Sequence, residues 1–320
     1  MMRAFATLFC FLLSLMVQPA RADSLVRMHE AASSRPIPAA AGEVRALATV
    51  DGHWLAATPE AVWIAAADGT WQREAWPVTD ARMPLQGMSG DGQRALAWFG
   101  GDAVSELWSV RAENGKIRLN RLPAPPSLRS IRVGFSTDAL YLAGLETSGK
   151  AALYRLGEAP GERWTSMQAP DATRVPSSLA ASGAQLLASL PQGGGDRVLR
   201  WTKKDGWRGA GVAPGRVVPG VVRPLGQAHL LYVLAGPEGD AQPWTLQTVT
   251  AAWAPLPGAR ARATAVFTSV DKGIAWLAPD RTVARATLSA PDLLLGTLDW
   301  TIIIVYLLAM TGIGQAIFPD

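Results

Sequence analysis

Short apolar segments recur along the middle of the chain at a nearly constant interval. Each has about five residues, is rich in Leu, Ala, Tyr and Trp, and starts roughly 42 to 46 residues after the previous one. Runs of this length, bounded by Gly, Asp, Ser and Pro, are typical of buried β-strands. The six copies are His53–Ala57, Ala95–Phe99, Leu140–Gly144, Gln185–Ser189, Leu231–Ala235 and Ile274–Ala278.

Further strands follow each copy and extend the repeat. The second strands are Ala61–Ala65, Leu107–Arg111, Ala152–Leu156, Val198–Thr202, Trp244–Gln247 and Val283–Thr287. The third strands are Trp71–Trp76, Ile117–Leu122, Arg163–Met167, Trp207–Val212 and Ala252–Leu256. Short strands that repeat with a period in the forties are the signature of propeller blades. The sequence therefore predicts an all-β fold, a six-bladed β-propeller over residues 23–290.

The sixth unit lacks its outermost strand, because Ser289-Ala290-Pro291 runs directly into a different kind of segment. The stretch Ser24–Pro38, which ends in Arg35-Pro36-Ile37-Pro38, resembles the closing strands of the other units. We expect this stretch to complete blade six and to close the ring, which removes most exposed sheet edges. The alternative fold is an irregular pair of β-sandwiches.

The N-terminus has the three parts of an export signal. Met1-Met2-Arg3 is a short basic segment, Phe5–Val17 is apolar, and Ala20-Arg21-Ala22 fits the small-x-small rule for cleavage. This order predicts a signal peptide over residues 1–22 and a mature chain that starts at Asp23.

The C-terminus carries a second apolar run. Residues 301–318 contain no charge, and as a helix they would span roughly 27 Å, close to the thickness of the hydrocarbon core. We predict a linker over 291–297 and a transmembrane helix over 298–318. An exported propeller then lies in the periplasm, and a single-pass anchor in the inner membrane leaves Asp320 at the cytoplasmic side.

Composition narrows the classes of function. Apolar residues make up 49% of the chain and there are 13 Trp, which indicates a packed core rather than a disordered stalk. The basic residues are scattered, so nucleic-acid binding has no support. The only cysteine, Cys10, lies in the signal peptide, and His29, His53 and His229 have no ligand spacing. We therefore expect no disulfide, no metal site and no cofactor.

One arginine precedes nearly the same point of every unit. Four of them stand nine residues before an Asp or Gly, and two deviate by one and three residues. In a propeller this place is the loop that enters the innermost strand, beside the central channel. A ring of guanidiniums there favours a carboxylate or phosphate. The predicted ligand-binding residues are Arg45, Arg82, Arg129, Arg174, Arg216 and Arg262.

Carboxylates occur in the neighbouring loops between the second and third strands of the blades. An arginine and a carboxylate on one rim could hold an acidic sugar and move a proton at its anomeric oxygen. Glu146 and Glu238 are the candidate catalytic residues, beside Arg129 or Arg216. The alternative role for each arginine is structural, in an ion pair with a neighbouring blade or as a cap on a loop carbonyl.

The repeat resembles the kelch family of propellers, particularly the group similar to N-acetylneuraminate mutarotase. The resemblance rests on the six units, on the unit end from Trp253 through Pro257 to Arg262, on the strand Leu231–Gly236, and on the double glycine Gly100-Gly101. It implies a propeller that binds an acidic sugar, with the interconversion of its anomers as a subsidiary hypothesis.

The segment Leu298–Gly314 looks like the opening of sodium:solute symporters, where Leu-Asp-Trp leads into an apolar helix with Tyr and a Gly-Ile-Gly end. The resemblance implies an exported propeller fused ahead of a transporter, with the other transporter helices missing from this chain. Its expected partners are then a sugar or other small anionic ligand and the inner membrane. Two alternatives stay open: a non-enzymatic scaffold that binds proteins, and an inactive truncated gene product.

Overall fold

The computed structural model describes residues 27–32, 36–66, 68–80, 83–113, 116–157, 159, 161–225, 228–289 and 306. The predicted signal peptide, the linker 291–297 and the predicted helix 298–318 apart from Tyr306 lie outside these residues, as does Arg82. Within the described part of the chain, no helix has both the length and the apolarity needed to cross a membrane. Residues Met28–Leu288 form one compact unit.

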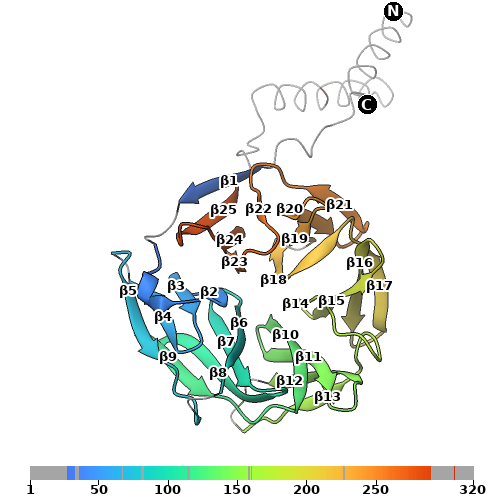
Figure 1. Cartoon of the computed structure of the whole chain (residues 1–320). Coiled ribbons are helices and arrows are strands. Elements are labelled where there is room, and N and C mark those ends of the chain that lie inside the picture. The colour runs from blue at the N-terminus through green and yellow to red at the C-terminus, as the bar shows by residue number, and fades with distance from the viewer. Residues whose placement is uncertain are drawn as a thin grey trace, which may run out of the picture. The chain divides into compact units, whose positions relative to one another are not determined.

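This unit is a six-bladed β-propeller, as the repeat predicts (Figure 1). Blade one contains β2 (Ala46–Val50), β3 (His53–Ala57), β4 (Ala61–Ala65) and β5 (Trp71–Ala75). Blade two contains β6 (Leu85–Gly90), β7 (Arg94–Gly100), β8 (Val104–Glu113) and β9 (Lys116–Arg121). Blade three contains β10 (Leu128–Ser136), β11 (Ala139–Glu146), β12 (Ala151–Gly157) and β13 (Thr165–Met167).

The remaining blades follow the same plan, with antiparallel neighbours numbered outward from the centre. Blade four contains β14 (Ser178–Ser182), β15 (Gln185–Gln192), β16 (Gly195–Thr202) and β17 (Gly206–Val212). Blade five contains β18 (Arg216–Leu225), β19 (His229–Ala235), β20 (Asp240–Gln247) and β21 (Ala252–Pro255), and the short β22 (Ala261–Arg262) pairs with β20. Blade six contains β23 (Phe267–Val270), β24 (Gly273–Leu277) and β25 (Val283–Ser289).

The ring closes through a strand from the start of the described chain. β1 (Arg27–Ala32) is the outermost strand of blade six, beside β25, which confirms the prediction made for the stretch that contains it. The amide of Met28 also donates to the carbonyl of Pro257, at 2.8 Å, and so joins β1 to the end of blade five. Gly258 lets the two segments meet, because a Cβ there would lie 2.1 Å from the carbonyl oxygen of Met28.

The core lies between neighbouring blades, where the apolar faces of their strands meet. One cluster joins blades one and two around Leu55, Leu85 and Phe99, and another joins blades four and five around Leu230 and Tyr232. Tryptophans of the outer strands also fasten blades to each other. The indole Nε1 of Trp164 donates to the carbonyl of Pro123 at 3.2 Å, and that of Trp207 donates to the carbonyl of Gln168 at 2.7 Å.

The repeated apolar segments are the second strands of the blades, and the innermost strands precede them. Some innermost strands, such as β14 (sequence SLAAS) and β23 (FTSV), consist largely of small and hydroxyl residues, whereas β10 and β18 contain Val, Leu and Arg. This composition fits their place, because one side of each strand faces the channel and the other faces a closely packed neighbour.

Candidate functional site

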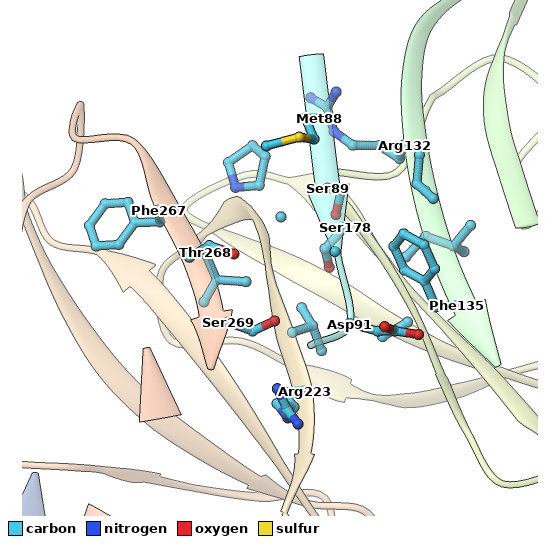
Figure 2. Close-up of a pocket in the computed structure, with 18 of the residues that line it drawn as sticks. Met88, Ser89, Asp91, Arg132, Phe135, Ser178, Arg223, Phe267, Thr268 and Ser269 are labelled. Carbon is cyan, nitrogen blue, oxygen red and sulfur yellow. The ribbon is translucent and has the colours of Figure 1, made fainter. Parts of the chain in front are cut away.

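A cavity of about 750 Å³ occupies the centre of the ring and is lined by residues of all six innermost strands. We call the end where these strands begin, marked by Arg45 and Ser177, the entry mouth. We call the end at the turns into the second strands, marked by Asp91 and Gly92, the turn mouth. Ser89 and Ser269 face the space between the two mouths (Figure 2). The channel wall therefore combines serines and arginines with apolar residues such as Leu47, Val133 and Phe267.

Arg132 lies near the entry mouth. Its Nε donates to the carbonyl of Ser177 at 3.0 Å, and its Nη1 donates to the carbonyl of Ile131 at 2.8 Å. Burial lowers the pKa of this guanidinium, because the charged form loses water. Among the described residues, no carboxylate forms an ion pair with Arg132. The positive charge is held by neutral carbonyls only.

Arg223 of β18 lies at the turn mouth, next to Gly92 of the opposite side of the ring. A Cβ on Gly92 would lie 3.2 Å from Nη1 of Arg223, so the glycine permits this close approach. The nearest acid is Asp271, whose Oδ1 is 3.7 Å from Nη2 and whose side chain is 85% exposed. Nη1 itself is buried and has no hydrogen-bond partner in the described chain. A weak exposed pair of this kind contributes little.

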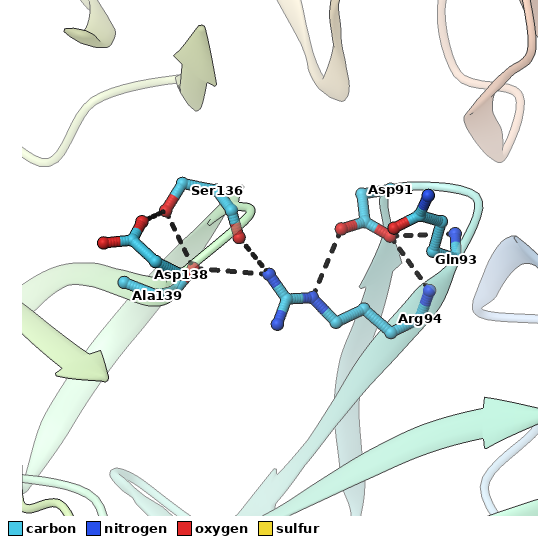
Figure 3. Close-up of polar contacts among 6 residues, drawn as sticks. All are labelled: Asp91, Gln93, Arg94, Ser136, Asp138 and Ala139. Carbon is cyan, nitrogen blue, oxygen red and sulfur yellow. Dashed lines mark hydrogen bonds and ion pairs between the residues drawn. The ribbon is translucent and has the colours of Figure 1, made fainter. Parts of the chain in front are cut away.

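Asp91 and Arg94 lie beside this site but are engaged with each other and with blade three (Figure 3). The Nε of Arg94 is 3.2 Å from Oδ2 of Asp91, and Nη2 donates to the carbonyls of Ser136 and Ala139. The guanidinium also lies over the ring of Phe135, 5.6 Å from its centroid. Burial lowers the pKa of Arg94, and Asp91 partly offsets this shift. This pair therefore forms part of the wall between blades two and three.

The predicted arginines lie in different places, and one of those described lines the cavity. Arg45 does so; its Nη1 donates to the carbonyl of Leu85 at 3.1 Å, and its Nη2 is 3.5 Å from Glu43. Arg129 borders a separate shallow depression that Arg45 and Asp102 also border. Arg82 lies outside the described residues.

The other three predicted arginines are exposed and lie beside acids of the chain. Arg174 forms an ion pair of 2.8 Å with Asp171. Arg216 lies 4.0 Å from the buried Asp196. Arg262 stands opposite Asp240 in the β20–β22 pair. The structure does not bring these three into the channel, and their role in ligand binding stays a prediction.

The candidate catalytic carboxylates lie on turns between second and third strands. Glu146 ends β11 and accepts a hydrogen bond from the hydroxyl of Tyr154, at 3.0 Å, which contributes to a raised pKa for Tyr154 after the larger effect of burial. Glu238 is exposed in the turn before β20. Neither residue is among those that line the channel cavity. Their catalytic role stays a prediction.

Sequence reasoning missed Arg132 and Arg223, which both line the channel cavity. Both lie inside innermost strands, three and seven residues after the predicted Arg129 and Arg216. The alternation of inward and outward positions in these strands could have identified them. Backbone irregularities obscure that alternation, because the register shifts between Arg129 and Arg132 and between Val217 and Val222. Within the described ranges, no group of His, Cys, Asp and Glu has the arrangement of a metal site.

Comparison with known proteins identifies the fold but no family. No family model and no curated protein sequence matches the chain. A protein of unknown function from Bacteroides thetaiotaomicron is similar in structure, with a TM-score of 0.53 and 8% identity over 82% of this chain and 76% of that one. Virginiamycin B lyase from Staphylococcus aureus has a TM-score of 0.49 and 13% identity, covering 82% and 100% of the two chains. The SapL1 lectin, in complex with alpha methyl fucoside, has a TM-score of 0.49 and 12% identity, covering 72% and 87%.

Proposed function

We propose that the propeller binds a small anionic ligand in its central channel, and that an acidic sugar is the first class to test. The proposal rests on two arginines of the cavity wall: Arg132 has no carboxylate partner among the described residues, and Nη1 of Arg223 is buried without a hydrogen bond, its nearest acid being the exposed Asp271 at 3.7 Å. Holding a guanidinium away from water without an ionic partner costs free energy. A ligand carboxylate recovers this cost through charge-assisted hydrogen bonds, and hydroxyls such as those of Ser89 and Ser269 suit a sugar.

The shape of the site favours a small ligand over a protein partner. A protein-binding rim is broad and has an apolar centre, whereas this cavity lies between six strands and has five arginines among its lining residues. Across the described residues, the large hydrophobic side chains that are strongly exposed are Val212, Val249 and Tyr306. Val212 and Val249 lie in blade four and the loop after β20, away from the inner strands. The scaffold hypothesis therefore remains the second candidate.

Binding can be tested with a matched pair of sugars. N-acetylneuraminate carries a carboxylate, and N-acetylmannosamine is a related neutral sugar. Calorimetry on the purified propeller should give at least tenfold tighter binding of the acid, since one charge-assisted hydrogen bond contributes about 1.5 to 3 kcal/mol. Equal affinity for the acid and the neutral sugar contradicts the proposal. The absence of saturable binding for every acidic sugar tested contradicts it as well.

The wider setting of the domain is proposed from the sequence. An export signal over 1–22 and the apolar run 301–318 support a periplasmic propeller tethered to the inner membrane, of kelch type and fused to the start of a sodium:solute symporter. Protease added to spheroplasts should digest the propeller, and full protection contradicts this location.

Anomer interconversion through Glu146 and Glu238 is a separate proposal. NMR of a pure sialic acid anomer tests it, and a rate equal to that in buffer excludes it.

A further inference from the structure

Arg132 and Arg223 of the channel wall lie near opposite mouths. Arg132 bonds to the carbonyl of Ser177, one residue before β14 begins. Arg223 lies against Gly92, which follows the end of β6. In the view of Figure 2, Arg132 and Arg223 lie on opposite sides of Ser89 and Ser269. A single carboxylate that pairs with one of these guanidiniums therefore leaves the other for a second group of the ligand.

The remaining charges of the channel do not neutralise these two arginines. Asp91 is the acidic residue that lines the described cavity, and Arg94 holds it at 3.2 Å. Arg45 has Glu43 beside it, outside the cavity lining. Asp271 lies 3.7 Å from Arg223 but is solvated. The described cavity lining therefore holds more positive than negative charge, with Arg132 near the entry mouth and Arg223 at the turn mouth.

Hydroxyl groups lie between these charges. Ser89 and Ser269 come from blades two and six, and both lie between Arg132 and Arg223 in the view of Figure 2. Neither hydroxyl makes a hydrogen bond to another residue of the described chain. They are available to the middle of a ligand as donors and acceptors.

We infer that the ligand is a small molecule with an acidic group at each end and hydroxyl groups between them. This inference rests on the proposed function, because it concerns the same channel. A ligand with one acid would form a charge-assisted hydrogen bond with one of these guanidiniums, whereas a diacid does so with both. The sugar diacids with six carbons are the simplest members of this class.

Three compounds with the same six-carbon chain test the inference of a diacid separately from the proposed function of anion binding. Glucitol has no carboxylate, gluconate has one and glucarate has two, and calorimetry measures the affinity of the wild-type propeller for each. Gluconate should bind more tightly than glucitol, and the affinity for glucarate should be at least about ten times that for gluconate. Equal affinity for gluconate and glucarate overturns the inference but leaves anion binding intact. Equal affinity for all three compounds overturns the proposed function as well.

Two variants test whether each arginine binds one acidic group of the ligand. Arg223→Gln and Arg132→Gln should each abolish the advantage of glucarate over gluconate, because each removes one end of the site. Arg208→Gln is the matched control, since Arg208 is exposed on the outer strand β17 and outside the cavity lining, and it should keep the wild-type ratio. A ratio that survives Arg223→Gln overturns the inference. Arg223→Gln also removes the contact of 3.7 Å with the exposed Asp271, so urea unfolding of this variant should accompany the binding measurement and show a stability close to that of wild type.

Discussion

Asp171 holds the segment that enters blade four in a fixed turn. Its carboxylate accepts hydrogen bonds from the amides of Thr173 and Arg174, at 2.9 and 3.0 Å, and pairs with the guanidinium of Arg174. The hydrogen bonds from Thr173 and the contact with Arg174 lower the pKa of Asp171 from 3.8 to about 2. A lowered pKa means that the charged form stabilises the folded state, so Arg174 has a structural contact here.

We expect the stability that the Asp171 carboxylate contributes to be lost at low pH. Because the folded pKa lies below the unfolded one, the contribution of Asp171 is complete above about pH 4 and disappears as the pH falls through about 2. Asp171→Asn should lower the free energy of unfolding by about 2 kcal/mol at pH 6, and the difference from wild type should shrink towards pH 2. Urea unfolding at both pH values measures it. A difference between the two proteins that does not change with pH would show that the charge of Asp171 does not contribute to stability.

At the scale of elements, blades two and three depend on a polar clamp. Arg94 begins β7, and its side chain is 9% exposed. It reaches the turn between β10 and β11, where it donates to Ser136 and Ala139 while holding Asp91 (Figure 3). Loss of this side chain leaves two carbonyls and one carboxylate without their partner in a largely buried place. The clamp therefore contributes to the packing of two blades rather than to one strand.

Arg94→Met should lower the free energy of unfolding by about 3 kcal/mol, the typical cost of breaking a buried ion pair from one side. Arg155→Met is the matched control. Arg155 pairs at 3.0 Å with Asp138 in the same β10–β11 turn, but that carboxylate is 74% exposed. Loss of this pair should lower the free energy of unfolding by less than about 1 kcal/mol. Equal costs for the two variants, measured by urea unfolding at pH 7, would contradict a clamp.

The sequence predicts the outer elements of each blade better than the inner ones. Segments such as Leu231–Ala235 stand out because they are buried on both faces and are therefore continuously apolar. The innermost strands, such as β14, expose small and hydroxyl residues to the channel, and no apolar pattern identifies them. Arg132 and Arg223 lie in these strands beyond bulges that shift the register. The fold was therefore predictable from the repeat, whereas the direction of individual arginines depended on backbone irregularities.

For the whole molecule, closure of the ring depends on six residues that are far in sequence from their partners. β1 (Arg27–Ala32) covers the outer edge of β25 and buries Met28, which is 2% exposed. It also touches blade five through the Met28 amide. Since each blade packs on two neighbours, an unclosed blade six weakens the packing of the blades on both of its sides.

Two truncations that differ by these six residues test closure. A chain that starts at Arg27 keeps β1, and a chain that starts at Ser33 lacks it. We expect the shorter chain to lose about 3 kcal/mol or more, from burial of Met28 and several strand hydrogen bonds, and its Tm to fall by roughly 5 °C or more. Amide hydrogen exchange in β24 and β25 should accelerate in the shorter chain more than exchange in β11 and β12 of blade three, which lies across the ring from blade six. Identical melting temperatures for the two truncations would mean that blade six is complete without β1 and that the ring is held by the contacts between blades alone.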